Sequence, residues 1–303
     1  MVTFKQVYNK GTVAMLKDIS DWEHIGYGGK STLEKEELKS PTGLKYIIKY
    51  PRKFELGVSW EDITELIAAK IGSILGLEMM EVEIVTRGDE RGCLLRNFVD
   101  EYGAKMHEEG GVLLDSLADG YDELQASNSK NKDLIAEGFH MLTQFNYWSK
   151  IKDTYIDMLI FDILIGNQDR HPFNWQILYF DTGYRFSPIY DNGASLGFRL
   201  EDHQLHEMVS NRVKVDRYVR NARVKAGMFE RKHVKAKDLL EYIQVHFPNE
   251  LKNSIRKLDG FDLVQYQEFI QTLNLLSEAQ KDWLELIIPY RRQKIFEWIK
   301  GGG

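Results

Sequence analysis

The spacing of apolar side chains divides the chain into a sheet-rich first third and a helical remainder. Apolar residues recur at helical spacing over residues 60–77, which predicts an amphipathic helix that ends near Gly76. Runs rich in apolar, aromatic and β-branched residues predict strands over residues 43–50, 80–86 and 93–99. We therefore expect a small sheet with one helix at the start of the chain.

Beyond about Tyr102 the apolar positions follow a helical period. The helix expected over residues 152–165 is apolar on most sides, which is typical of a helix inside a core. A hairpin follows it, with strands over 175–180 and 184–187 around a turn at 181–183. The other helices are expected over residues 132–148, 234–247, 249–258, 277–287 and 289–300.

These elements predict an α+β chain of two lobes with a cleft between them. We place a small sheet-rich N-terminal lobe at residues 1–101 and a larger helical C-terminal lobe at residues 102–300. A chain of 303 residues with 43% hydrophobic residues is long enough for two such lobes. The polar segment 118–132 is expected to be a mobile loop.

Charge and cysteine content narrow the class of protein. A formal net charge of −6 argues against a dedicated nucleic-acid binder, because binding to phosphate backbones needs clustered Lys and Arg. The one basic stretch, Arg212 to Lys232, has apolar residues between its charges, so we interpret it as a solvated helix face. The single Cys93 excludes an intrachain disulfide, and its apolar neighbours favour a buried thiol.

The sequence contains no sign of a membrane segment. No apolar run approaches the roughly 20 residues of a membrane helix. The first residues also lack the charged-then-apolar pattern of a signal peptide. We expect a cytoplasmic protein without a membrane partner or a direct nucleic-acid partner.

Asp169, Asn174 and Asp191 have the spacing that phosphoryl transfer needs. Asn174 follows Asp169 by five residues, and Asp191 lies just past the predicted hairpin, which doubles the chain back. In that chemistry the first carboxylate orients or deprotonates a hydroxyl, while the Asn and the second carboxylate hold Mg²⁺ on the phosphates of ATP. Taken singly, these residues and His171 are ordinary turn, capping or hydrogen-bonding residues. Their combination favours a phosphotransfer site.

A Gly-rich stretch, residues 26–32, is a candidate phosphate loop. Glycines let backbone N–H groups approach phosphates closely. The stretch lacks the full spacing of a Walker motif and the apolar strand before it, so we reject that assignment. A flexible loop over phosphates and a plain surface turn remain equal alternatives.

Lys49, at the end of a predicted strand, can reach the phosphates of ATP from the sheet-rich lobe. Strand alternation puts Lys45 on the same face, so the pattern alone does not choose between the two lysines.

Glu61 and Glu65 lie one turn apart on the following helix, off its apolar stripe. Either can pair with Lys49, and solvated surface carboxylates are an equal alternative.

Four passages together resemble the HipA-like serine/threonine kinases of bacteria. They occur in the family's order and, with the Gly-rich loop, span roughly residues 25 to 200. The passages are residues 46–52, residues 60–68 with 75–77, residues 161–171 with Asn174, and residues 187–193. The resemblance implies a two-lobed kinase fold with ATP and Mg²⁺ in the cleft.

The same resemblance assigns roles in the reaction. It implies that Asp169 is the catalytic base, and His171 beside it is a second catalytic candidate. It implies that Asn174 and Asp191 are the metal ligands.

The resemblance also implies which residues bind the nucleotide. Lys49 resembles the family's phosphate-binding lysine, with Glu65 as its partner. Independently of the resemblance, the two-lobed layout places a nucleotide hinge near residues 96–101, which makes Arg96 and Phe98 candidates for binding the nucleotide. The phosphate loop over residues 28–32 comprises Gly28, Gly29, Lys30, Ser31 and Thr32. Autophosphorylation at Ser31 or Thr32 is an expectation, because some family members silence themselves that way.

We interpret the chain as a protein serine/threonine kinase that acts on an unidentified protein. The alternatives are a small-molecule or lipid kinase of related fold, a catalytically silent nucleotide-binding pseudokinase, and a metal-dependent hydrolase using Asp169, His171 and Asp191. The chain is shorter than the longest family members and resembles the compact, stand-alone type. An antitoxin-like partner therefore has no support in these residues.

Overall fold

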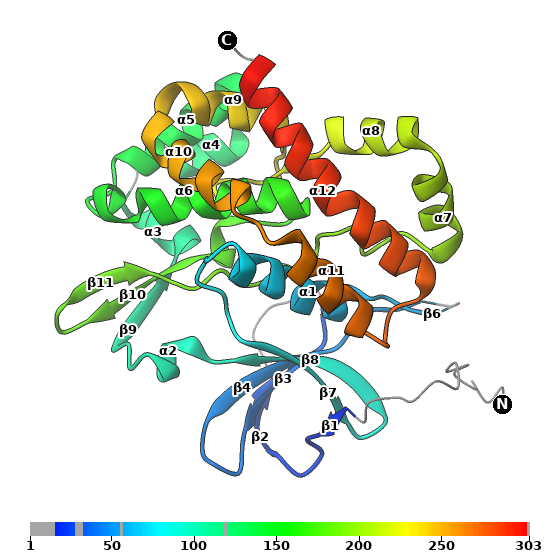
Figure 1. Cartoon of the computed structure of the whole chain (residues 1–303). Helices are drawn as coiled ribbons and strands as arrows, with labels where there is room; N and C mark the ends of the chain where they lie inside the picture. The colour runs from blue at the N-terminus through cyan, green and yellow to red at the C-terminus, as the bar shows by residue number, and fades with distance from the viewer. Residues whose placement is uncertain (1–15, 28–32, 55–56, 118–119, 302–303) are drawn as a thin grey trace.

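The fold has two lobes, with one sheet-rich lobe below a larger helical lobe in the view of Figure 1. The computed structural model describes residues 16–27, 33–54, 57–117 and 120–301. The expected two-lobed α+β fold is confirmed, while the lobe boundary at residue 101 stays a prediction. None of the described helices combines the length and the apolar character that crossing a membrane requires.

A six-stranded sheet forms the smaller lobe, in the order β1-β7-β8-β4-β3-β2. Ile48 points into a cluster with Leu38, Val85 and Leu94, so the alternation of the strand turns Lys49 to the opposite face. The strands are β1 (Lys17–Asp18), β2 (Glu23–Tyr27), β3 (Lys35–Lys39), β4 (Lys45–Lys49), β7 (Val82–Arg87) and β8 (Glu90–Arg96). A separate ribbon pairs β5 (Lys53–Phe54) with β6 (Gly57–Val58).

Helix α1 (Glu61–Ile74) connects the sheet to the helical lobe. The stripe that predicted this helix, including Ile63, Ile67 and Ile71, is buried in the main core. Glu61 and Glu65 are buried as well, so the polar side of the helix faces protein groups rather than solvent. Buried carboxylates need partners, and those partners belong to the site described below.

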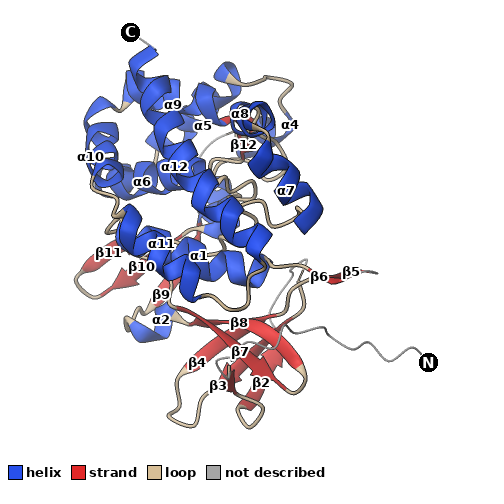
Figure 2. Ribbon diagram, turned by 45° about the vertical axis from the view of Figure 1, so that its right-hand side comes forward, coloured by secondary structure: helices blue, strands red, loops and turns tan. Residues whose placement is uncertain are grey.

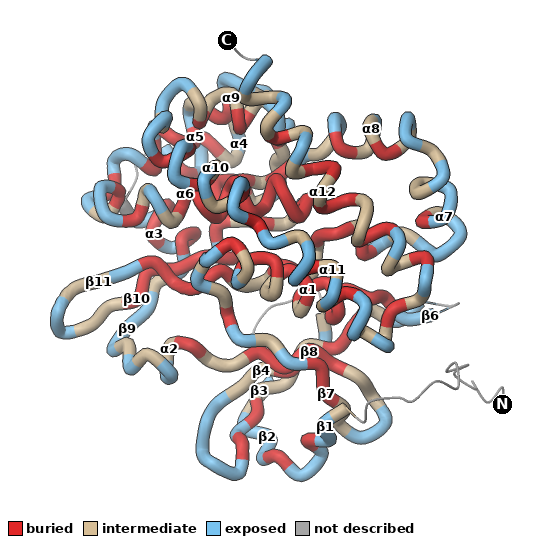
Figure 3. The backbone as a smooth tube through the Cα atoms, viewed as in Figure 1, coloured by how far each residue is buried: buried red, intermediate tan, exposed pale blue. Residues whose placement is uncertain are grey.

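The larger lobe is built around α6 (Trp148–Ile165), which is buried along most of its length (Figure 3). This confirms the burial that its apolar sequence predicts. The other helices of this lobe are α3 (Gly110–Leu117), α4 (Tyr121–Ala126), α5 (Lys132–Thr143), α7 (Asp202–Ser210), α8 (Arg212–Arg220), α9 (Ala236–His246), α10 (Pro248–Asp259), α11 (Leu263–Thr272) and α12 (Glu278–Gly301). The short helix α2 (Phe98–Glu101) lies beside the six-stranded sheet, where Phe98 packs with Ile84 and Leu95. A short antiparallel pair, β12 (Arg223–Val224) with β13 (Val234–Lys235), follows α8.

Helix α12 corrects one expectation. Two helices are expected over residues 277–287 and 289–300, but α12 is continuous through Pro289. An interior proline costs about 3 kcal/mol because it removes a backbone hydrogen bond and clashes with the preceding turn. The helix continues because side chains on both sides of the proline, from Trp283 to Ile295, are buried in the main core.

Part of the segment 118–132, expected as a mobile loop, is helical, while residues 118–119 lie outside the described residues. The segment contains α4, whose Tyr121 and Leu124 are buried in the main core. Two aromatic or aliphatic anchors on one short helix outweigh the polar character of the residues around them.

A small sheet of order β11-β10-β9 stands at the edge of the helical lobe (Figure 2). Its strands are β9 (Met106–Glu109), β10 (Gln176–Phe180) and β11 (Gly183–Phe186). The antiparallel pair β10 and β11 confirms the predicted hairpin. Since a hairpin returns the chain to its starting edge, the loop before β10 and the segment after β11 emerge side by side.

Gly110, at the start of α3, offers a test of this packing. A Cβ atom there would lie 2.1 Å from the ring of Trp175, which is buried and stacked on Phe186. We expect Gly110→Ala to lower the free energy of unfolding by about 1–3 kcal/mol through overpacking, measured by urea denaturation. Gly260→Ala is the control, because its Cβ would meet nothing closer than 3.5 Å. Equal stability of both variants would contradict the packing described.

Candidate active site

An open cavity of about 670 Å³ lies between the sheet and the helical lobe. Its volume is within the range of roughly 300–1,000 Å³ usual for small-molecule sites. Ile47 and Lys49 line it from one face of β4, and the loops on either side of the hairpin line it from the other lobe. It brings together eight residues singled out from the sequence: Lys49, Glu65, Arg96, Phe98, Asp169, His171, Asn174 and Asp191.

The loop between α6 and β10, here called the catalytic loop, places Asp169 beside Asn174. Gly166 ends α6 in the left-handed conformation with φ +68°, which turns the chain out of the helix. The Asn167 side chain then accepts a hydrogen bond from the Asp169 N–H at 2.9 Å. The Asn174 amide group donates to the Asp169 carbonyl at 2.9 Å. The five-residue spacing therefore closes a compact loop in which both side chains face the cavity.

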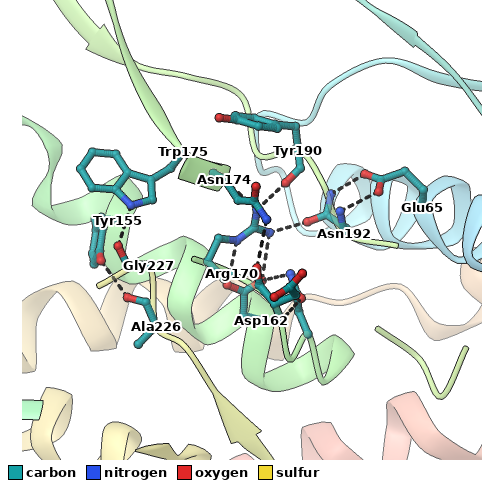
Figure 4. A network of polar contacts seen from close by, with 12 residues as sticks. Glu65, Tyr155, Asp162, Arg170, Asn174, Trp175, Tyr190, Asn192, Ala226 and Gly227 are labelled. Atoms are coloured by element: carbon teal, nitrogen blue, oxygen red, sulfur yellow. Dashed lines mark hydrogen bonds and ion pairs between the residues drawn. The ribbon is translucent and has the colours of Figure 1, made fainter. Parts of the chain in front are cut away.

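Arg170 is fully buried beneath this loop and binds several segments at once (Figure 4). Its Nε and Nη2 donate two parallel bonds to the Asp162 carboxylate, each of 3.0 Å. Nη1 donates to the Asn174 carbonyl at 3.0 Å and to the Tyr190 carbonyl, and Nη2 also reaches the Asn192 side chain. One guanidinium thus joins α6, the catalytic loop and the segment after β11.

Asp191 is turned into the cavity by a left-handed backbone with φ +59°, and Lys49 Nζ lies 2.6 Å from its Oδ1. Burial would lower the pKa of Lys49, but the nearby carboxylates of Asp191 and Glu65 outweigh it and raise that pKa. Burial would likewise raise the pKa of Asp191, but Lys49 holds that pKa below its ordinary value. Both groups are therefore charged at neutral pH.

Glu65 fixes the segment that carries Asp191. Its Oε2 accepts the backbone N–H groups of Asn192 and Gly193 at 2.7 Å each, and its Oε1 accepts the Asn192 side chain at 3.1 Å. The hydrogen-bonded partner of Lys49 is therefore Asp191, while Glu65 acts on Lys49 only through its charge. Glu61, the alternative candidate, forms an ion pair with Arg52 at 3.6 Å.

Asp169 is held by a residue that the sequence analysis missed. Lys225 Nζ lies 2.5 Å from Asp169 Oδ1.

His171, the second catalytic candidate, lies on the cavity wall, and its Nδ1 accepts the Phe173 N–H at 3.2 Å. Burial lowers the pKa of His171, which favours the neutral ring. That bond caps the short 3₁₀ turn at Pro172–Asn174, and a catalytic role for His171 stays a prediction.

The far end of the cavity lies against the start of α2. Arg96 forms ion pairs with Glu81 at 2.8 Å and with Glu101 at 3.1 Å. Phe98 is buried against Tyr190, with ring centroids 5.5 Å apart. Arg96, Asn97, Phe98 and Val99 therefore line the cavity at the place where a hinge is expected. The predicted phosphate-loop residues, Gly28, Gly29, Lys30 and Ser31 together with Thr32, lie outside the described residues.

The donor atoms suit a magnesium ion that arrives with phosphates. Among the described residues, no group of three or more His, Cys, Asp or Glu side chains is arranged to hold a metal ion. Mg²⁺ commonly binds through one or two protein oxygens together with substrate phosphates and water. The amide oxygen of Asn174 and the carboxylate of Asp191 line the same cavity and fit that pattern.

The sequence analysis did not identify the residues that support the site, Asp162, Arg170 and Lys225. Asp162 has a signal, since a carboxylate inside an almost wholly apolar helix needs a buried partner. Arg170, next to Asp169, is that partner. Lys225 has no comparable signal, because it lies 56 residues from Asp169 within a generally basic stretch.

Comparisons with known proteins identify the family of this chain. The model of the HipA-like C-terminal domain matches residues 22–251. The serine/threonine-protein kinase CtkA of Helicobacter pylori is 24% identical over 260 residues, which are 83% of this chain and 77% of CtkA.

Two solved structures share the fold. The crystal structure of CtkA, described as a proinflammatory kinase, superposes with a TM-score of 0.73 at 21% identity over 95% of this chain and 98% of that one. A HipA chain from Shewanella oneidensis, solved with HipB and operator DNA, gives 0.55 at 14% identity over 94% of this chain and 67% of that one.

The buried pair of Arg170 and Asp162 generates a prediction about stability. Asp162→Ala leaves a fully buried guanidinium without its counter-charge, so we expect a loss of about 3–5 kcal/mol in the free energy of unfolding. Asp282→Ala, on an exposed position of α12, is the matched control and should change little. Urea denaturation measures both, and a loss below 1 kcal/mol for Asp162→Ala would contradict the role given to the pair.

Proposed function

The chain belongs to the family of the HipA-like C-terminal domain, and on that premise we propose that it is an ATP- and Mg²⁺-dependent protein serine/threonine kinase. The observation that carries the proposal is that Asp169, Asn174 and Asp191 line one cavity together with Lys49. These are the groups that kinases use for positioning and for charge stabilisation. A metal-dependent hydrolase would have no need of a buried, charged lysine at this place.

In the proposed reaction, an acceptor hydroxyl oxygen bonds to the γ-phosphorus of ATP as the bond from that phosphorus to the bridging oxygen of ADP breaks. Asp169 orients the hydroxyl and accepts its proton, since its carboxylate is half exposed at the cavity. Asn174 and Asp191 would hold Mg²⁺, which neutralises charge on the phosphates when bound. ADP and the phosphorylated acceptor then leave.

Lys49 and the hinge region account for nucleotide binding in this proposal. Lys49 stays protonated because of its carboxylate neighbours, so it offers a fixed positive charge to the phosphates of ATP. Arg96 and Phe98 also line the cavity, and the base is proposed to lie against them. The loop of residues 28–32 is proposed to cover the phosphates, and its Ser31 and Thr32 are the proposed autophosphorylation sites.

We propose a protein as the acceptor, because the similar CtkA is a serine/threonine-protein kinase. A small-molecule or lipid acceptor is the alternative. The HipB protein and operator DNA solved with the Shewanella HipA belong to that complex, and we propose no such complex for this chain.

We expect Asp169→Asn to lower phosphate transfer by roughly 10²–10⁴-fold while ATP binding is kept, because this side chain faces the acceptor. The measurement is transfer of label from ATP with Mg²⁺ to the protein itself and to generic protein acceptors, with calorimetry for ATP binding. Asp181→Asn, on the exposed hairpin turn, is the control. Turnover near that of the unaltered protein in Asp169→Asn would refute the assignment.

Asp191→Ala should lose the gain in ATP affinity that Mg²⁺ provides, because the proposed metal ligand is removed. Calorimetric titrations with ATP, with and without Mg²⁺, measure this directly. The variant also frees Lys49 from its ion pair, so ATP binding without Mg²⁺ should persist. A Mg²⁺ effect as large as in the unaltered protein would show that the ligand lies elsewhere.

A further inference from the structure

The segment after β12 is fastened to the underside of the catalytic loop at one tight turn, Ala226–Gly227 (Figure 4). The N–H of Gly227 donates to the Arg170 carbonyl at 2.7 Å. The Trp175 indole N–H donates to the Gly227 carbonyl at 2.8 Å, and the Tyr155 hydroxyl donates to the Ala226 carbonyl at 2.7 Å. Three hydrogen bonds from buried groups thus fix this turn against the catalytic machinery.

The backbone of the turn is strained to make this contact. Ala226 has φ +56° and Gly227 has φ +67°, and alanine rarely adopts the left-handed region. A Cβ atom on Gly227 would lie 2.6 Å from the Tyr155 hydroxyl, so only glycine fits. Such strain costs on the order of 1–3 kcal/mol and persists where the surrounding structure imposes it, often at functional sites.

The turn places the side chain of Lys225 in the candidate active site. Lys225, the residue immediately before it, places Nζ 2.5 Å from Asp169 Oδ1, and its side chain is only 13% exposed. The Asp169 side chain is 48% exposed. Within the described residues, Oδ2 of Asp169 accepts no hydrogen bond. Lys225 therefore fixes Oδ1, and Oδ2 is free to bind the hydroxyl that receives the phosphate.

We propose that Lys225 is a positioning residue for phosphate transfer, which holds Asp169 through Oδ1 so that Oδ2 meets the acceptor hydroxyl. The inference rests on the proposed kinase function. It adds to the proposed site a residue that belongs neither to the catalytic loop nor to the segment that carries Asp191. The ammonium also offsets the negative charge of Asp169, which must work close to the phosphates of ATP. A misplacement of about 1 Å at a reacting group can lower the rate about 10²-fold.

A purely structural brace is the competing explanation, and the contacts argue against it. The segment is already held by the Ala226–Gly227 turn and by Gln125 of α4, which bonds to the Met228 carbonyl at 3.0 Å and to the Glu230 N–H at 3.0 Å. The pair adds little to stability, because its Asp169 partner is half exposed to solvent. Lys225 is therefore dispensable for holding the segment, and its effect should fall on the reaction.

Steady-state kinetics with labelled ATP, Mg²⁺ and casein as the acceptor probe test the proposal. We expect Lys225→Met to lower kcat about 10²-fold while the KM for ATP and the melting temperature stay unchanged. Lys225→Arg should recover most of the loss, because it keeps the charge. Lys257→Met is the matched control, because it breaks the pair with Asp157 on α6, away from the cavity.

A double-mutant cycle separates action through Asp169 from other effects. In the Asp169→Asn background, Lys225→Met should cost nothing further, since the carboxylate that it positions is gone. An unchanged kcat in Lys225→Met, an additive loss in the double variant, or a loss that follows a lowered melting temperature would overturn the proposal. An unaltered protein that binds Mg²⁺–ATP but transfers no phosphate would instead refute the kinase function, and the inference with it.

Discussion

The buried guanidinium of Arg170 is the interaction on which the rest of the site depends. A buried charge is costly unless it is paired and fully hydrogen-bonded. Arg170 meets that demand with Asp162, two backbone carbonyls and the Asn192 side chain. These acceptors come from a core helix, the catalytic loop and the segment after the hairpin. The hydrogen bonds of this one guanidinium therefore fix the loop that carries Asp169 and Asn174 relative to the segment that carries Asp191.

Asp169 and Asp191 are each paired with a lysine, and the two lysines come from different lobes. Lys49 on β4 pairs with Asp191, and Lys225 of the helical lobe pairs with Asp169. Glu65 joins the lobes, since it sits on α1 and accepts the N–H groups of the segment that carries Asp191. A shift between the lobes would strain these contacts first, so the geometry of the cavity and the placement of the lobes are coupled.

The sequence predicts those features of the structure that depend on residues close together in the chain. Helix α1, the apolar α6, the hairpin and the convergence of Asp169, Asn174 and Asp191 all follow from periodicity and spacing. The continuous α12 does not, because tertiary burial outweighs the local preference of Pro289. Lys225 does not either, because its role depends on a strained turn whose contacts lie far away in the chain. The sequence expectation made Glu65 the partner of Lys49, but its hydrogen bonds go to Asn192 and Gly193, and such long-range contacts are visible only in three dimensions.

The most direct test of the central claim is a crystal structure with Mg²⁺ and a non-hydrolysable ATP analogue. The account predicts the triphosphate in the interlobe cavity, with the ion about 2.1 Å from oxygens of Asn174 and Asp191. It also predicts that Asp169 binds no metal and stays paired with Lys225 beside the γ-phosphate. A nucleotide outside this cavity, or a metal ion held without Asn174 and Asp191, would contradict it.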